Sequence, residues 1–251
     1  VANIATDIQT RLSVLGYLQG IEVESQVFFG SLFFPMSNRV APFNDTTVRQ
    51  AVSHAFNYEE YLTEILKGLY VRSQGMIPNG MFGHVNDLPI GSYDSEKAKQ
   101  LLSESNYPDG YSITIAYATN RWYRERARNA ALLMKENLFS IGWTAPIDVV
   151  GLTHAEAATK LRNGEIQMLY SGWWMDWCDP DNYVYTMAHS NGWWADCIGY
   201  SNPQVDEWTI QARSTPNPEV RQALYRQIEL QVSEDTLYVF LHQHVDYLAR
   251  R

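Results

Sequence analysis

The sequence has few cysteines, fewer basic than acidic residues and no long apolar run. Its 251 residues include two cysteines and 19 Lys and Arg against 28 Asp and Glu. The formal net charge of −9 argues against a nucleic-acid partner and against anionic membranes, because both repel an acidic surface. A run of about 18 apolar residues, which a membrane-spanning helix needs, does not occur.

The start of the chain lacks the features of an export signal. Residues 1–20 contain no charged beginning, no apolar block and no cleavage site. The chain opens with Val1, so we expect the true start to have been removed by processing or by truncation. The two cysteines, Cys178 and Cys197, could form a disulfide or remain buried free thiols, and the sequence leaves both open.

Catalytic and metal-binding motifs are also lacking. The sequence contains no GxSxG, no HExxH and no phosphate-binding loop. The six histidines are scattered. His242 and His244 would share one face of a strand, but two ligands do not complete a metal site. We therefore expect no cofactor.

Local patterns predict alternating helices and strands. Residues that cap a helix begin six predicted helices, at Asp45, Asn57, Asp94, Thr153, Asn202 and Asn217. A further helix runs from about Tyr123 to Gly142. Strands are predicted at 113–117, at 147–149, at 166–171 and in the tail after Thr236. This β-α-β alternation is typical of an α/β layer.

Aromatic residues gather in the segment GWWMDWCDPDNYV, at 172–184, directly after a predicted buried strand. Ligand sites in open α/β sheets lie at the carboxyl ends of strands, and aromatic side chains often line them. Asp179 and Asp181 have a structural explanation, because Asp179 can cap a short helix that starts at Pro180. Asp176, between Trp174 and Trp177, has no such role.

Five segments together resemble the family of extracytoplasmic solute-binding proteins, family 5, of peptide- and nickel-type ABC importers. They are APFNDTTVRQAVSHAFNYEEYL (41–62), YDSEKAKQLLSESNYPDG (93–110), GWWMDWCDPDNYV (172–184), GYSNPQVDEW (199–208) and RQALYRQIELQVSED (221–235). The resemblance covers roughly residues 21–250, and this chain looks like the C-terminal portion of such a protein.

The resemblance implies an α/β fold: a type II periplasmic-binding-protein lobe with a mixed sheet flanked by helices, and terminal strands that cross to a missing N-terminal lobe. Residues 1–40 would be an extended segment from the hinge, 41–236 the ligand-binding lobe and 237–251 the returning strand. The protein would be no enzyme. It would lie in the periplasm or, as a lipoprotein, at the cell surface, and deliver a peptide to a membrane permease.

The resemblance also implies site residues. In peptide-binding members an aspartate at the position of Asp176 pairs with the ligand's amino group, and in dipeptide-binding members an arginine near Arg121 pairs with its carboxylate. A carboxylate among aromatic rings is costly to desolvate unless a cation meets it. The tryptophans expected to wall the pocket are Trp173, Trp174, Trp177, Trp193 and Trp194. At least one of Trp173 and Trp174 should face the core, because side chains alternate along a strand.

Other interpretations stay open. An oligosaccharide or a nickel complex could replace the peptide in the same transport role, since indole rings suit stacking on sugars. The acidic residues among the tryptophans could mimic a glycosidase pair, although the helix cap explains two of them. A sensor could use the same lobe without transport.

Overall fold

One mixed β-sheet organises the computed structural model, which describes residues 22–89 and 91–250. Its strands are β1 (Glu22–Pro35), β2 (Val71–Arg72), β3 (Ile113–Ala118), β4 (Ile147–Leu152), β5 (Met168–Trp174) and β6 (Tyr238–Arg250). They form a six-stranded sheet in the order β2-β6-β1-β5-β3-β4. β3 runs parallel to β4 and β5, whereas β1 runs antiparallel to β5 and β6. The expected α/β fold with a mixed sheet is confirmed.

Helices cover this sheet, and predicted capping residues begin six of them. The helices are α2 (Thr46–Ala55), α3 (Tyr58–Glu60), α4 (Ser95–Glu104), α5 (Arg124–Ser140), α6 (His154–Arg162), α7 (Asp181–Ala188), α8 (Trp193–Ile198), α9 (Pro203–Ser214) and α10 (Pro218–Asp235). The six predicted capping side chains, which begin α2, α3, α4, α6, α9 and α10, each accept a hydrogen bond from a backbone amide of the first turn. These caps satisfy amides that have no partner within their helix.

The helix predicted from Asn57 differs from the expectation in one respect. After α3 the chain widens into a π-helical turn, η1 (Tyr61–Ile65), whose C-cap residue is Leu66. Gly68, where the sequence predicted the end of the helix, follows in a left-handed conformation. In η1 the buried Tyr61 hydroxyl contacts the Tyr170 hydroxyl at 2.8 Å and His242 Nδ1 at 2.9 Å. Contacts of this kind link residues far apart in the sequence, so local spacing did not reveal them.

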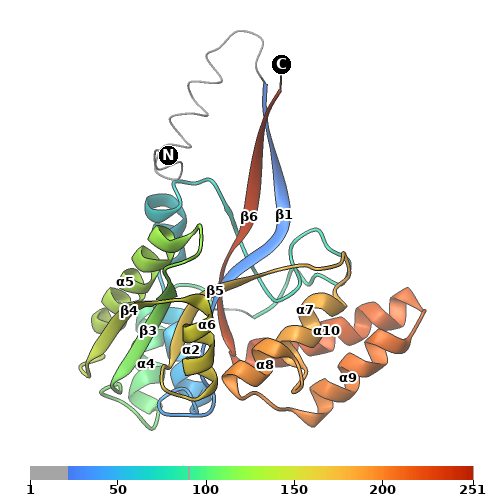
Figure 1. The fold of residues 1–251 in the computed structure, drawn as a ribbon. Coiled ribbons are helices and arrows are strands. Elements are labelled where there is room, and N and C mark those ends of the chain that lie inside the picture. Colours follow the sequence, from blue (N-terminus) through green and yellow to red (C-terminus); the bar gives the residue numbers. More distant parts are fainter. Residues whose placement is uncertain (1–21, 90, 251) are drawn as a thin grey trace.

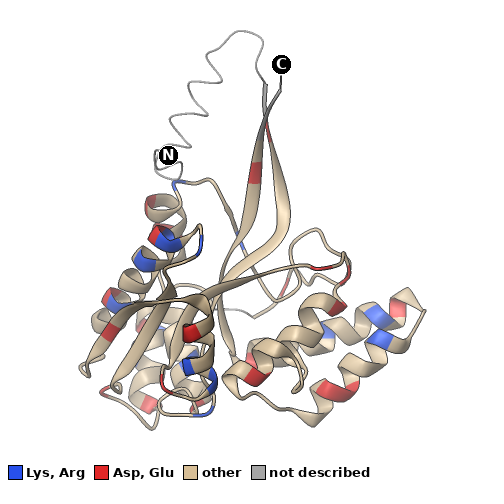
Figure 2. Cartoon of the chain, in the orientation of Figure 1, with Lys and Arg blue, Asp and Glu red and all other residues tan. Residues whose placement is uncertain are grey.

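The hydrophobic core has two halves, one on each face of the sheet. Successive β1 residues alternate between them: Leu32 and Phe34 pack with α2, α4 and α5, whereas Phe33 packs with α6 to α10. Figure 1 shows α7, α9 and α10 gathered on one side of the sheet and α2, α4 and α5 on the other. Charged residues lie mainly on the helices, and the strands carry few of them (Figure 2).

Strands β1 and β6 extend beyond the body of the molecule as a two-stranded ribbon (Figure 1). The ladder between them is continuous from Glu22↔Arg250 to Val27↔Val245 and resumes at Ser31↔Gln243. Residues 31–33 of β1 also pair with β5, so β1 belongs to the sheet at one end and projects from it at the other. Residues 1–21 of the expected extended segment lie outside the described residues.

Candidate functional site

A pocket of about 460 Å³ opens at one edge of the sheet. Its lining consists of Arg121, Trp122, Tyr123, His154, Gly172, Trp173, Trp174, Asp176, Trp193 and Trp194. Six of the seven residues expected at the ligand site therefore lie around one cavity. Five of the ten lining residues are tryptophans: the four expected ones and Trp122.

The parallel strands place the pocket. β3 ends at Ala118 just before Arg121, β4 ends two residues before His154, and β5 ends at Trp174. Parallel neighbours present their carboxyl ends at the same edge of a sheet, and crevices at that edge are the common ligand sites of α/β proteins. The pocket thus lies where the strand order places it.

Strand β5 is longer at its carboxyl end than predicted. The sequence placed the strand at 166–171, but it continues to Trp174, because residues 171–174 pair with β1. Trp173 packs against one half of the core and Trp174 against the other, as alternation requires. Trp173 Nε1 donates to Asn182 Oδ1 at 2.7 Å, and Trp174 stacks on Tyr123 with a centroid distance of 6.0 Å.

The other three expected tryptophans differ from one another. Trp193, at the first position of α8, is 38% exposed, and its ring contributes to the pocket wall. Trp194 also lines the pocket but is completely buried, so it is mainly a core residue. Trp177 is 52% exposed and does not line the pocket, so its contact with a ligand stays a prediction.

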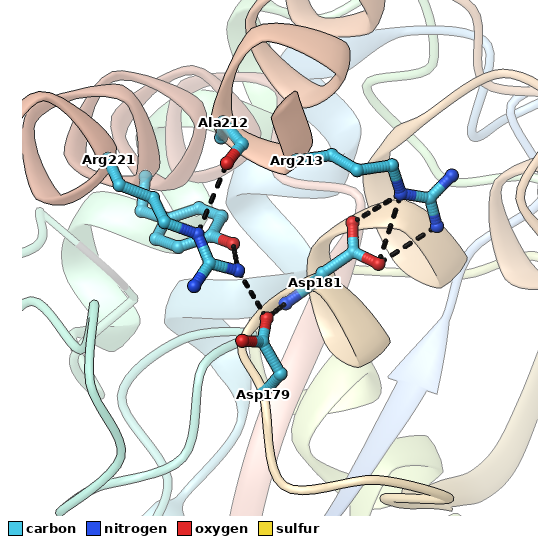
Figure 3. A network of polar contacts seen from close by, with 6 residues as sticks. Asp179, Asp181, Ala212, Arg213 and Arg221 are labelled. Carbon is cyan, nitrogen blue, oxygen red and sulfur yellow. Dashed lines mark hydrogen bonds and ion pairs between the residues drawn. The ribbon is translucent and has the colours of Figure 1, made fainter. Parts of the chain in front are cut away.

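Two of the three aspartates after β5 are neutralised by the chain itself (Figure 3). Asp179 accepts a hydrogen bond from the Asp181 amide at 2.8 Å and pairs with Arg221 of α10 at 2.5 Å. Asp181 forms a bidentate pair with Arg213 of α9, at 2.8 and 3.0 Å. Asp179 thus holds the amide at the start of α7, close to the expected cap, although Pro180 is the N-cap residue. The two arginine pairs were not expected, and they tie the start of α7 to α9 and α10.

Asp176 is different from its two neighbours. It is exposed, and within the described residues it makes no hydrogen bond and no ion pair. Arg121, which lines the same pocket, is likewise exposed and pairs with no carboxylate among residues 22–89 and 91–250. The pocket therefore carries one free anionic and one free cationic side chain between aromatic walls.

Four lining residues were not among the expected site residues. Gly172 begins the predicted aromatic segment, whereas sequence reasoning missed Trp122, Tyr123 and His154 altogether. The signals were available. Trp122 and Tyr123 follow Arg121 directly, and the predicted cap at Thr153 placed His154 at the start of a helix that follows a strand. Applying the carboxyl-end rule to every parallel strand, and not to β5 alone, would have found them.

The two cysteines require a correction, because both are free and form no disulfide with each other. Cys178 is exposed in the segment between β5 and α7, whereas Cys197 is completely buried in α8. Arg162 Nη2 donates to Cys197 Sγ at 3.2 Å, and burial raises the pKa of this thiol to about 11. The alternative expectation, two buried free thiols, holds for Cys197 but not for the exposed Cys178.

The described part of the chain offers neither a metal-binding cluster nor a membrane-spanning helix. It contains no group of three or more His, Cys, Asp or Glu side chains placed to hold a metal ion. None of its helices combines the length and the apolar character needed to cross a bilayer.

The amino-acid sequence is similar to those of known proteins. Residues 5–195 match the family described as "Bacterial extracellular solute-binding proteins, family 5 Middle". The chain is 30% identical over 194 residues to the dipeptide-binding protein of Escherichia coli K12, an alignment covering 75% of this chain and 36% of that protein.

Solved structures share the fold. The structure of HbpA2 from Haemophilus parasuis has a TM-score of 0.87 at 20% identity and covers 98% of this chain, which spans 48% of it. The periplasmic binding protein DppA from Helicobacter pylori, in complex with the peptide STSA, has a TM-score of 0.83 at 23% identity, with coverages of 98% and 47%. The chain thus spans half or less of the length of these proteins. The matched residues, the sheet and the helices around it together show that this chain belongs to the bacterial extracellular solute-binding proteins of family 5, a family of binding proteins and not of enzymes.

Proposed function

We propose that the full-length protein captures a short peptide with free amino and carboxyl ends outside the cytoplasm and delivers it to the permease of an ABC importer. The observation that carries this proposal is the pair of free charges in one pocket. Asp176 and Arg121 have no partner of their own among the described residues, whereas the neighbouring Asp179 and Asp181 are both paired with arginines.

A zwitterionic peptide supplies the two missing partners. Its ammonium group would meet Asp176, and its carboxylate would meet Arg121, whose planar guanidinium can form two parallel hydrogen bonds with a carboxylate. When a second surface closes over the pocket and removes water, a charge without a partner becomes costly. A neutral ligand would leave both Asp176 and Arg121 desolvated and without a partner of opposite charge.

The size of the cavity favours a short peptide. A volume of about 460 Å³ lies within the range of small-molecule sites, and both free charges border this one cavity. The indole walls would contact apolar parts of the ligand without selecting one side chain. The dipeptide-binding relative from Escherichia coli is consistent with a ligand of this kind.

The domain organisation is part of the same proposal. Residues 41–236 would form the ligand-binding lobe, and the segments before and after it would lead to a second lobe. The projecting β1–β6 ribbon supports this division, because it leaves the body of the sheet with both strands still paired.

The test is calorimetry on the full-length protein with a dipeptide, its N-acetyl form and its C-terminal amide. We expect Asp176→Asn to weaken dipeptide binding by about 1.5–3 kcal/mol, which is roughly 10- to 150-fold in Kd. The N-acetyl form should bind weakly to the wild type and lose little further in this variant. Asp148→Asn, an exposed change on β4 outside the pocket, serves as the control.

An oligosaccharide is the second candidate, because the five indoles of the lining suit stacking on sugar rings. A thermal-shift screen of peptides against sugars separates the two. Stabilisation by sugars alone, or equal dipeptide affinity in wild type and Asp176→Asn, would refute the peptide proposal.

A further inference from the structure

His154 is a polar side chain in an otherwise aromatic part of the pocket wall. It is the first residue of α6, and its half-buried ring lies parallel to the Trp193 indole at a centroid distance of 6.2 Å and an interplanar angle of 11°. The ring also meets the edge of Trp194 at 6.5 Å and 88°. Two indole rings therefore contact the imidazole, and a third, polar contact helps to fix its orientation.

The third contact comes from β5. His154 Nε2 lies 3.2 Å from the hydroxyl oxygen of Ser171, which is completely buried. This contact occupies one ring nitrogen, so Nδ1 is the nitrogen left for the pocket. The backbone amide of His154 donates to Asn120 Oδ1 at 2.9 Å, which anchors the start of α6 to the segment that carries Arg121.

The charges around His154 are few. Burial lowers the pKa of the imidazole, and the positive charge of Arg121, on the segment between β3 and α5, lowers it further. On α8, Asp196 is already paired with Arg162 at 2.8 Å. Glu156 lies in the first turn of α6 itself, and Asp176 belongs to the same pocket. β5 (MLYSGWW) carries no charged residue, so Ser171 acts on the ring only as a neutral hydroxyl.

We propose that His154 contacts the ligand's carboxylate together with Arg121 and strengthens that contact in acid. This inference rests on the proposed function. At neutral pH the imidazole is uncharged and Arg121 is the principal cation for the carboxylate. A bound carboxylate neutralises Arg121 and removes the repulsion that opposes protonation of His154, so protonation and binding favour each other.

The test measures how much the protein prefers a free carboxylate at two pH values. Calorimetry on the full-length protein compares a dipeptide with its C-terminal amide at pH 5.5 and pH 7.5. The ratio of the two affinities cancels the titration of the ligand's amino group. We expect the preference for the free carboxylate to rise several-fold at pH 5.5. A rise of one unit in the pKa of His154 on binding sets a limit of about tenfold, which is reached only below both pKa values.

Two variants identify the group responsible. His154→Phe keeps an aromatic ring against Trp193, and His154→Gln keeps a polar partner for Ser171, but neither titrates in this range. In both, the preference should be the same at the two pH values. His54→Gln, on α2 and outside the pocket, should behave like the wild type. NMR titration of the wild-type imidazole gives a second readout, in which the dipeptide raises the pKa of His154 and the amide does not.

The outcomes are distinguishable. A preference that does not change with pH in the wild type, or a pH effect that persists in His154→Phe and His154→Gln, overturns the role of His154 and leaves the peptide proposal intact. If the wild type binds no dipeptide at either pH, both proposals fail.

Discussion

Glu229 of α10 is completely buried, and no basic side chain in the described part of the chain pairs with it. Its two carboxylate oxygens accept hydrogen bonds from the backbone amides of Met76, at 3.2 Å, and Ile77, at 2.7 Å. Gly75 makes this approach feasible, since a Cβ there would lie 2.8 Å from a Glu229 oxygen. One side chain thus fastens the irregular segment after β2 to a helix far away in the sequence.

Burial raises the pKa of Glu229 from 4.5 to about 7, against the opposing effect of the two amides. The folded state therefore holds this proton more tightly than the unfolded state, and stability is lost as the pH rises from 4.5 through 7. The full difference corresponds to about 3 kcal/mol. We expect urea denaturation to show this loss in the wild type and a clearly smaller one in Glu229→Gln.

Glu234→Gln, an exposed change on the same helix, is the matched control and should keep the wild-type dependence. The assignment would be wrong if Glu229→Gln lost as much stability as the wild type between pH 5 and pH 8.

At the scale of elements, the interruption in the β1–β6 ladder lies against the pocket. Between Val27 and Ser31 the β1 chain advances four residues while β6 advances only two, from Val245 to Gln243. Gly30 lies in this interruption and opposite Trp174 of the pocket wall. Such irregularities bend strands locally, so this place is a candidate hinge for the ribbon.

Gly30→Ala tests the contact. A Cβ at this position would lie 2.4 Å from Trp174 Nε1, so the indole would have to move. We expect a loss of about 1–3 kcal/mol in urea denaturation, because overpacking a rigid ring forces strain into its surroundings. Dipeptide affinity should fall as well, since Trp174 walls the pocket.

Trp174→Phe in the Gly30→Ala background provides the control. The smaller ring should relieve part of the strain and recover part of the stability relative to Gly30→Ala alone. A Gly30→Ala protein as stable as the wild type would show that the indole has room to move and that the contact does not constrain the ribbon.

At the scale of the molecule, the sheet divides two half-cores and ends in a ribbon with both strands paired (Figure 1). If this ribbon joins a second lobe, ligand capture should bring the two lobes together, with the interruption at Gly30 absorbing the change. Small-angle scattering on the full-length protein should then show a smaller radius of gyration with saturating dipeptide than without it.

Asp176→Asn offers the comparison for this measurement, because it removes the expected ammonium partner while leaving the ribbon unchanged. At the same dipeptide concentration it should remain extended. An unchanged radius in the wild type at saturation would contradict closure of two lobes.

The sequence by itself determined most of the helices and strands and the segment that borders the aromatic pocket. Caps such as Asp45 and Thr153 act within their own first turn, and the alternation of Trp173 and Trp174 follows from strand geometry, so nearby residues carry that information. The family resemblance then indicated Asp176 and Arg121. The start of α7 was predicted to within one residue, from Asp179 and Pro180.

Only the tertiary structure decided which side chains meet. The partners of Asp179 and Asp181 are arginines about 30 to 40 residues away, which left Asp176 as the free carboxylate. The role of His154 in the wall, the burial of Glu229 and the separation of the two cysteines also depend on contacts between distant segments. Because burial and pairing are properties of the packed chain, and not of a local window, no pattern of neighbouring residues contained them.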